Sequence, residues 1–231
     1  MTATASQLPI PTAAIADATV RLQLPVQWAP ATLRPLIPDS AFSGPARPVT
    51  HVGSVDVLLE VIGESEPGDV LVIDNGGRTD EACIGDLLVA EAALAGIAGI
   101  VLWGAHRDTA ELRRIGLPIH SLGAFPLGPR RIPPAAAAMR TASLDSVLVS
   151  TGDTVTADDD GVLLLNPLDA DRILELAGQI QGVETAQAQL IRSGRSLRDQ
   201  VDFAGYLASR AADPSLTLRQ HLNIRGSALE A

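Results

Sequence analysis

The sequence predicts a mixed α/β fold, on three observations made along the chain. Short apolar runs alternate with helical patterns between residues 69 and 123, a turn-rich stretch of alternating residues follows residue 140, and helical periodicity dominates from residue 168. Short buried runs separated by helices are typical of parallel strands with crossovers, whereas alternation broken by tight turns is typical of hairpins. We therefore expect a central β/α/β core, a hairpin region and C-terminal helices.

The first part of the chain is dominated by proline. Residues 25–48 carry so many prolines that we expect a loop with short extended pieces. Apolar residues at helical spacing then predict a helix over about 51–62. The stretch EPGDVLVIDNGG predicts a turn, a buried strand over 69–73 and a glycine turn.

The central segments alternate regularly between helix and strand. GDLLVAEAALAG is rich in Ala and Leu, which predicts a helix that ends at Gly96. IAGIVLWG predicts a second buried strand, RDTAELRRIG a short helix that ends at Gly116, and LPIHSLG a third strand. This order implies parallel strands joined by right-handed crossovers.

The sequence pattern changes beyond residue 140. LDSVLVSTGDTVTADDDGVLLLNP predicts hairpins with a tight turn at 159–161, and this explains the acidic residues there better than a calcium site does. A helical pattern covers 168–207 with a break near Ser193–Gly194, and we expect the polar C-terminal stretch to extend over the surface or over a neighbouring subunit. Because the sequence contains no repeat or linker, we expect a single domain over residues 1–231.

Composition excludes several classes of protein. The chain has 231 residues, 46% hydrophobic and 19% charged, and a net charge of −10, which is unlike a nucleic-acid binder with a basic face. All 17 basic residues are Arg, so chemistry that needs a lysine Schiff base or a Walker lysine is excluded. The single cysteine and the absence of a signal peptide or membrane-spanning run lead us to expect a cytoplasmic protein.

Charged residues follow the first and second predicted strands, in the loops DNGGRTDEACIGD and GAHRD. Since ligands collect beyond the carboxyl ends of parallel strands, Asp86 and the pair Arg107–Asp108 should converge. Gly85 and Asp86 open a helix whose first amides suit a carboxylate, and Arg107 can clamp the same group with its guanidinium. The Asp86 and Asp108 oxygens suit Mg²⁺ or Mn²⁺, which would polarise a bound 2-oxo acid toward its enolate.

Each of these residues also has a structural explanation. Asp86 could cap the start of a helix, and Asp108 stands three residues before Glu111 in a capping-box pattern. Arg107 could pair with any surface acid, and Cys83 is best explained as a buried structural residue. The four histidines show no metal-ligand spacing; His106 could enter the site, but an ordinary strand-end histidine is favoured.

At these residues the chain resembles the RraA-like family, that is, regulator of ribonuclease activity A and its relatives. The matching stretch is residues 68–119, with weaker matches near 40, 155 and 196. Its signature is an Asp, 20 intervening residues, Arg-Asp, and an acid three further on, which Asp86, Arg107, Asp108 and Glu111 satisfy. The family includes class II 4-hydroxy-4-methyl-2-oxoglutarate / 4-carboxy-4-hydroxy-2-oxoadipate aldolases.

The resemblance implies roles for the residues of the signature. Asp108 would ligate a divalent metal directly, Asp86 would hold it through water, and Arg107 would bind substrate and stabilise the enolate. The amides around Leu87 and Leu88 would receive the pyruvate carboxylate. The metal and substrate core would then cover about 68–125 and a C-terminal helical region about 168–231.

The resemblance also implies an architecture and an assembly. We expect a swivelling β/β/α domain that forms a homotrimer, or a hexamer of paired trimers. An acid would reach each site from a C-terminal helix of a neighbouring subunit, and Glu184 is the best positional candidate.

The expected activity is that of a metal-dependent lyase that cleaves 4-hydroxy-2-oxo diacids to pyruvate, with oxaloacetate decarboxylation at the same site. The substrate would be a small 2-oxo acid, with no nucleic acid or membrane as a partner. The alternative is a non-catalytic regulator that binds a ribonuclease or a helicase. The stretch 120–131 follows the aldolases less closely than the core does, which leaves the identity of the substrate open.

Overall fold

An eight-stranded mixed sheet organises the chain, in the order β1-β10-β9-β3-β4-β5-β6-β2, and a separate two-stranded ribbon pairs β7 with β8. The structure, a computed structural model, describes residues 9–130 and 140–224. Within these ranges the chain divides into two compact units, residues 9–13 with 25–171, and residues 14–24 with 172–224. The expectation of a mixed α/β fold with a central sheet is confirmed.

The strands have the following bounds: β1 (Gln27–Trp28), β2 (Arg34–Pro35), β3 (Phe42–Thr50), β4 (Val70–Ile84), β5 (Gly99–His106), β6 (Ile119–Ser121), β7 (Ala142–Leu144), β8 (Val147–Val149), β9 (Thr154–Asp158) and β10 (Gly161–Leu165). The helices are α1 (Thr12–Arg21), α2 (Asp56–Gly63), α3 (Asp86–Leu94), α4 (Thr109–Ile115), α5 (Ala170–Arg192), α6 (Leu197–Gln200), α7 (Phe203–Ala212) and α8 (Leu218–Ile224).

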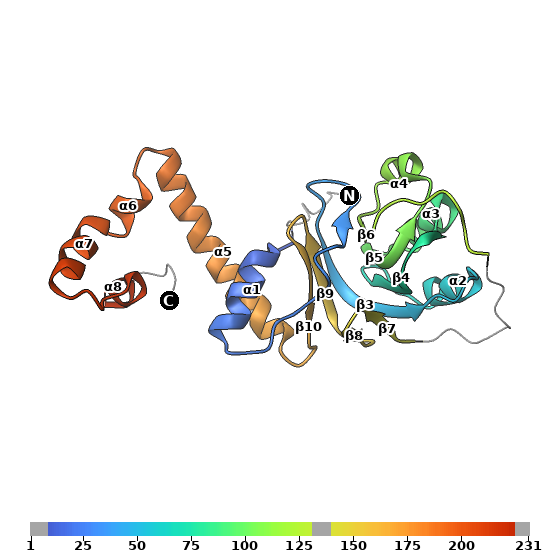
Figure 1. Cartoon of the computed structure of the whole chain (residues 1–231), viewed down its shortest axis with the longest axis horizontal. Helices are drawn as coiled ribbons and strands as arrows, with labels where there is room; N and C mark the ends of the chain where they lie inside the picture. Colours follow the sequence, from blue (N-terminus) through green and yellow to red (C-terminus); the bar gives the residue numbers. More distant parts are fainter. Residues whose placement is uncertain (1–8, 131–139, 225–231) are drawn as a thin grey trace, which may run out of the picture. The chain divides into compact units, whose positions relative to one another are not determined.

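Strand β4 separates two hydrophobic cores in the first unit. Its neighbours β3 and β5 both run parallel to it, and β6 runs parallel to β5. The helix–strand order predicts this direction for β4, β5 and β6. Leu71 and Ile73 belong to the core formed with α2, α3 and α4, the helices drawn beside these strands in Figure 1. Val70 and Val72 point the other way, into the core shared with β7, β8, β9 and β10. Burial on both faces explains the continuous apolar run in the sequence.

Strand β3 lies inside the sheet, where we expected a loop with short extended pieces. Pro45 and Pro48 argue against a central strand, because proline cannot donate to a ladder. The sheet accommodates them because β3 changes partners along its length: residues 42–45 pair with β9, and residues 46–50 pair with β4. Each half of β3 therefore pairs with a neighbouring strand along one edge. A proline nitrogen, which has no hydrogen to donate, can face the other edge.

The predicted glycine turn after residue 73 is wrong, because β4 continues to Ile84. Gly76 and Gly77 both have positive φ, 64° and 67°, and the pairing with β5 shifts register three times between Asp74 and Ile84. Positive-φ glycines here bulge the strand without reversing it. Despite the bulges, β4 stays paired with β5 as far as His106, the last residue of β5. The helix expected over 51–62 also begins later, at Asp56.

The other central predictions are confirmed. Helix α3 ends next to Gly96 and α4 ends next to Gly116, and both glycines have a φ of 81° as C-terminal helix stops require. Strands β9 and β10 form the expected hairpin, closed between Asp158 and Gly161. The Asp158 carboxylate accepts hydrogen bonds from the backbone and hydroxyl of Thr12, at 2.8 and 2.7 Å, which supports the hairpin explanation of the acidic residues.

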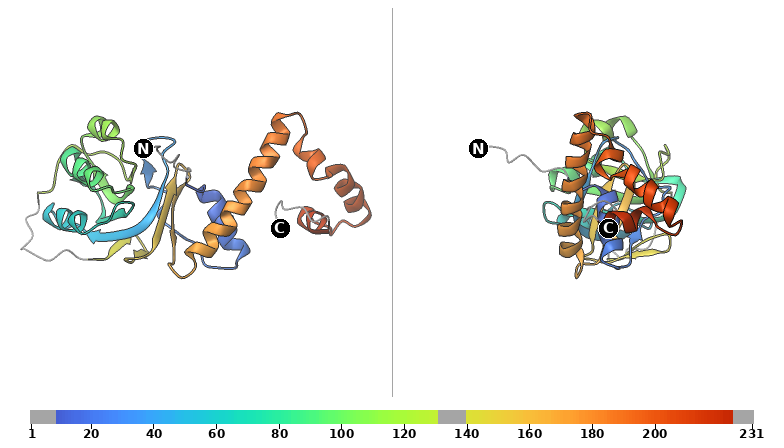
Figure 2. Two further views of the ribbon diagram at one scale, coloured as in Figure 1. Left: turned by 180° about the vertical axis from the view of Figure 1, so that it is seen from behind. Right: turned by 90° about the vertical axis from the view of Figure 1, so that its left-hand side faces the viewer.

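The second unit contains the C-terminal helices. Figure 2 shows α5 as one long helix, which ends before the expected break, where Gly194 has a φ of 97°. Within the polar C-terminal stretch, residues 218–224 form α8. The Thr217 hydroxyl accepts a hydrogen bond from the backbone amide of Gln220 at 3.2 Å and donates one to the side-chain oxygen of Gln220 at 2.9 Å. These two bonds cap the start of α8.

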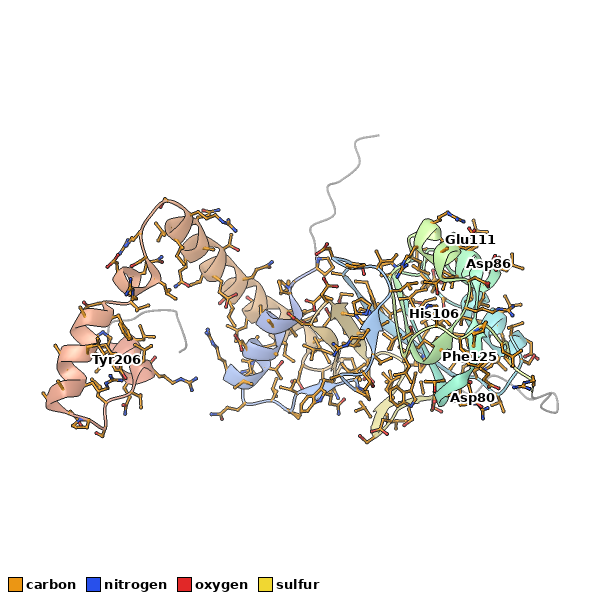
Figure 3. All side chains as sticks on the ribbon, turned by 45° about the horizontal axis from the view of Figure 1, so that its top comes forward. Asp80, Asp86, His106, Glu111, Phe125 and Tyr206 are labelled. Carbon is orange, nitrogen blue, oxygen red and sulfur yellow. The ribbon has the colours of Figure 1, made fainter. Side chains whose placement is uncertain are left out.

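Aromatic contacts stabilise this end of the chain. The Tyr206 ring, labelled in Figure 3, lies 5.7 Å from the His221 ring, and the Arg210 guanidinium lies 5.1 Å from the Tyr206 centroid. Leu222 is also buried. These contacts pack α8 against α7. None of the helices in the described ranges is long and apolar enough to cross a membrane.

Candidate functional site

The ends of β4 and β5 bring the predicted site residues together. Ile84, the last residue of β4, pairs with His106, the last residue of β5. The Arg107 amide then donates to the Ile84 carbonyl at 3.0 Å. Gly85 and Asp86 therefore leave the sheet at the point where Arg107 leaves it. The convergence expected at this edge of the sheet is observed.

Gly85 allows the two chain segments to approach closely. It occupies the N-cap position of α3 in an extended conformation, with φ −147° and ψ −170°. A Cβ atom here would lie 2.6 Å from Oδ2 of Asp108 and 3.1 Å from Nε of Arg107. A side chain at this position would therefore require the Asp108 carboxylate to move, and glycine lets the carboxylate lie next to the start of α3.

Asp108 directs its carboxylate toward the site and away from its own helix. It precedes α4 with φ 60° and ψ 35°, a left-handed conformation that Asp tolerates better than most residues, and it makes no side-chain cap hydrogen bond. Its Oδ2 lies 3.4 Å from the Asp86 amide and 3.5 Å from Nε of Arg107. The capping-box explanation is wrong for these side chains, because Glu111 pairs with Arg114.

Asp86 is the first residue of α3, and Gly85 takes the capping position. The Asp86 Oδ1 accepts from the Leu87 amide at 2.8 Å. A carboxylate in the first helical turn also interacts favourably with the helix dipole. Figure 3 labels Asp86 at the start of α3 and Glu111 on the neighbouring helix α4.

A pocket of about 460 Å³ opens beside these residues. Its polar end contains Asp86 and Arg107, and Leu87 and Leu88 of α3 contribute to its apolar wall. A smaller hollow of about 280 Å³ is lined by Arg107, Asp108 and Phe125. The Arg107 side chain, half exposed, therefore borders both cavities and is available to a ligand in either.

His106 is a buried structural residue next to the site, in agreement with the ordinary strand-end histidine that the sequence favoured. Its ring is buried, with Nδ1 2.8 Å from the Ser121 hydroxyl and Nε2 3.1 Å from the Thr109 hydroxyl. Burial, and secondarily the charge of Arg113, lowers its pKa, so the neutral ring is favoured. The ring connects the ends of β5 and β6 to the start of α4. Its partners are set by the sheet, so no local sequence signal identifies them.

Cys83 lines the pocket but is suited to a structural role. The residue is buried, and this burial together with the nearby Glu81 charge raises the pKa of its thiol. A protonated, desolvated thiol is a poor nucleophile. The expectation of a buried structural cysteine agrees with this environment.

The donor set fits a hard divalent cation in part. Asp86 and Asp108 supply two carboxylates, and within residues 9–130 and 140–224 the chain contains no group of three His, Cys, Asp or Glu arranged to hold a metal. Mg²⁺ commonly takes one or two carboxylates and keeps several waters, so a two-carboxylate site is compatible with it. Glu184, the predicted third acid, is exposed on α5 in the second unit.

Comparisons with known proteins identify relatives of this chain. A family model described as RraA-like, Aldolase/RraA, matches residues 12–164. A protein of Halalkalibacterium halodurans, provisionally named 4-hydroxy-4-methyl-2-oxoglutarate aldolase, is 32% identical over 170 residues, which cover 69% of this chain and 76% of that protein. A protein of Alkalilimnicola ehrlichii with the same provisional name is 32% identical over 130 residues, 53% of this chain and 76% of its own.

Solved structures show the same fold. The Streptomyces coelicolor protein RraAS2, described as an unusual member of the RNase ES inhibitor RraA family, matches with a TM-score of 0.66 and 28% identity, over 75% of this chain and 88% of its own. RraA of Thermus thermophilus, described as an RNA-processing inhibitor, matches with a TM-score of 0.58 and 28% identity. The match covers 66% of this chain and 92% of the Thermus chain.

Proposed function

The chain belongs to the RraA-like family, and from this premise we propose that it is a lyase that cleaves 4-hydroxy-2-oxo acids to pyruvate. The observation that carries the proposal is the convergence of Asp86, Arg107 and Asp108 beside a pocket. The relatives named as aldolases supply the reaction type. Since the chain has no lysine, the pyruvate enolate has to be stabilised without a Schiff base.

The carboxylate of the 2-oxo acid would bind to Arg107 and to the first turn of α3. The planar guanidinium can donate two parallel hydrogen bonds to a carboxylate. The Asp86 amide already faces the Asp108 carboxylate, and the Leu87 amide faces the Asp86 carboxylate. The substrate carboxylate would therefore compete for these two amides or bind the Leu88 amide. This arrangement would fix the keto group and C3 beside Asp86.

Asp86 and Asp108 would hold the divalent metal of the family, Mg²⁺ or Mn²⁺. When bound, such an ion supplies a Lewis acid that polarises the keto oxygen of a 2-oxo acid. Both carboxylates belong to partly or fully exposed residues, so water could complete the coordination.

The reaction would proceed as a retro-aldol cleavage. The C4 hydroxyl gives its proton to Asp86, directly or through one water, and its O–H electron pair forms the new carbonyl. The C3–C4 bond breaks, and its electrons pass to C3 as the pyruvate enolate, whose charge Arg107 stabilises. A proton returned to C3 completes pyruvate. Oxaloacetate would need no deprotonation step, because its C4 is already a carboxylate: its C3–C4 bond breaks, CO₂ leaves, and the bond electrons give the same enolate.

The proposal is tested by measuring pyruvate release with a lactate dehydrogenase couple over a panel of 4-hydroxy-2-oxo acids and oxaloacetate. We expect turnover that disappears with EDTA and returns with Mg²⁺ or Mn²⁺. Pyruvate release that is unchanged by chelation contradicts the metal role, and no release from any compound contradicts the lyase.

We also propose that the chain assembles as a homotrimer or a hexamer in which Glu184 of a neighbouring subunit completes the acidic set. An acid on an exposed face of α5 is available for such an intersubunit role. Sedimentation equilibrium gives the assembly, and Glu184→Gln should weaken the apparent affinity for Mn²⁺. A monomer at micromolar concentration contradicts this assembly.

The second candidate is a non-catalytic regulator of an RNA-processing enzyme. It is favoured by the two solved structures described as RNase or RNA-processing inhibitors. A pull-down that captures a ribonuclease or helicase, combined with no lyase activity across the panel, would establish it in place of the enzyme.

A further inference from the structure

We infer that His106 is a positioning residue, which acts through the Thr109 hydroxyl to hold the Asp108 carboxylate beside the start of α3. The proposed chemistry uses neither His106 nor Thr109. The inference rests on the proposed function only for the metal that Asp108 would bind. The position of the Asp108 carboxylate can be tested without a metal.

The His106 ring bridges the connection between β5 and α4. His106 is the last residue of β5, and Thr109 is the first residue of α4. The ring Nε2 lies 3.1 Å from the Thr109 hydroxyl, so this contact spans Arg107 and Asp108, the two residues between them. A connection of two residues that is held at both ends has few conformations available to it.

The His106 end of this connection is fixed to the sheet. Its backbone amide donates to the Gly123 carbonyl at 2.9 Å, and its carbonyl accepts from the Phe125 amide at 2.8 Å. Its ring is 3% exposed, and Nδ1 lies 2.8 Å from the hydroxyl of Ser121 in β6. In a neutral ring one nitrogen donates and the other accepts, and a hydroxyl can do either, so both tautomers allow both hydrogen bonds. The ring is therefore held at both nitrogens.

Asp108 has a backbone conformation that needs such support. Its φ of 60° and ψ of 35° are left-handed, which most residues with a side chain avoid. A side chain before a helix commonly accepts a hydrogen bond from the first turn, but the Asp108 side chain makes no such bond. Its Oδ2 lies instead 3.4 Å from the Asp86 amide and 3.5 Å from Nε of Arg107. The contact between Thr109 and His106 restrains the start of α4 in place of a cap, which leaves the Asp108 carboxylate available to the site.

His106 can affect a ligand only through its neighbours. Its ring is buried, whereas Thr109 lines the hollow of about 280 Å³ together with Arg107 and Asp108. Residues that orient a metal ligand through hydrogen bonds commonly change metal affinity by about 10–100-fold when they are replaced. Loss of the contact between His106 and Thr109 should therefore weaken the site although every group that would touch the metal is kept.

The first test measures Mn²⁺ binding to the full chain by calorimetry, in the absence of substrate. Thr109→Val removes the hydroxyl at nearly constant volume, and we expect the Kd for Mn²⁺ to rise about tenfold. Thr109→Ser keeps the hydroxyl and should restore the affinity of the unaltered chain. A Kd that is unchanged in Thr109→Val overturns the inference.

Thr19→Val is the matched control. The Thr19 hydroxyl is buried and donates to the Ile15 carbonyl at 2.8 Å within α1, in the second unit. Its removal should lower the thermal unfolding temperature and leave the Kd for Mn²⁺ unchanged. If Thr19→Val raised the Kd as much as Thr109→Val, the effect would belong to general loss of stability, and the inference would be wrong.

Variants of His106 test whether its effect passes through Thr109. The amide of His106→Gln can reach the place of Nε2, whereas the shorter amide of His106→Asn can replace only Nδ1. We therefore expect Mn²⁺ to bind more weakly to His106→Asn than to His106→Gln. Adding Thr109→Val to His106→Asn should cause no further loss, because changes to the two partners of one contact are not additive. Fully additive losses overturn the inference.

A crystal structure of Thr109→Val separates the inference from the proposed function. We expect the Asp108 carboxylate to move away from the Asp86 amide or to occupy more than one position. If the carboxylate moves but the unaltered chain binds no Mn²⁺, the metal role in the proposed function fails and the inference stands. A carboxylate that keeps its single position beside the Asp86 amide overturns the inference, whatever the affinity for Mn²⁺.

Discussion

Oδ2 of Asp108 lies 3.4 Å from the backbone nitrogen of Asp86, 22 residues earlier in the chain. The contact exists because β4 and β5 are parallel and end together, with Ile84 opposite His106. Each residue has an ordinary place at the start of a helix. Their meeting beside Arg107 is what makes a carboxylate-and-metal site reasonable.

Gly85→Ala should impair activity more than stability. The added methyl group would meet Oδ2 of Asp108 at 2.6 Å and Nε of Arg107 at 3.1 Å. Because both groups would have to move, we expect kcat/KM for pyruvate release to fall about 100-fold, as misplacement by about 1 Å can cause. Steady-state kinetics and a thermal melt measure both effects.

Gly182→Ala is the control for that variant. Gly182 lies inside α5 in the second unit, and nothing lies within 4 Å of the position that its Cβ would take. Alanine in a helix interior should stabilise by about 0.5–1 kcal/mol and leave kcat/KM unchanged. If both variants lost activity equally, the steric explanation for Gly85 would be wrong.

Arg107→Lys should lower kcat/KM by about 10–100-fold although it keeps the positive charge. An ammonium group cannot donate in the planar, paired geometry that a carboxylate accepts. Arg114→Lys is the matched control, because Arg114 is exposed, pairs with Glu111 and does not line the pocket beside Asp86. Full activity of Arg107→Lys would show that charge alone is sufficient.

His120 should make the protein less stable in mild acid. Burial lowers its pKa, against weaker opposing effects of the Asp158 carbonyl and nearby carboxylates, and its Nε2 lies 2.9 Å from that carbonyl. A lowered histidine pKa means that the unfolded chain binds the proton more readily below about pH 6.5. Its contribution is therefore present above that pH and is lost on acidification.

Urea unfolding at several pH values tests this sign. The free energy of unfolding should fall between pH 7 and 5, and the fall should be smaller in His120→Asn. Other groups contribute to the slope, so the difference between the two proteins is the quantity that matters. An identical slope in the variant would show that His120 does not contribute.

Local periodicity predicted the elements that are buried on both faces. Apolar runs predicted the strands around Val72 and Val101. Glycine helix stops predicted the ends of the helices next to Gly96 and Gly116. The parallel direction of β4, β5 and β6 followed from the alternation of strand and helix along the chain. The residues that end up at the edge of the sheet could therefore be named from the sequence.

Predictions failed where tertiary contacts override a local preference. Pro45 is tolerated in β3 because the strand exchanges β9 for β4, and Gly76 and Gly77 bulge β4 without ending it. Neither effect is visible without the neighbouring strands. The left-handed conformation of Asp108, whose carboxylate lies beside the Asp86 amide, was likewise not predicted from the sequence.

The activity and stability of Asp108→Asn test the central claim most directly. Asparagine keeps the size of the side chain and tolerates the left-handed backbone, but it loses the negative charge. The account predicts that pyruvate release falls at least about 100-fold while the free energy of unfolding changes by about 1 kcal/mol or less. Retained pyruvate release together with a clear loss of stability would contradict it, because Asp108 would then be a structural residue.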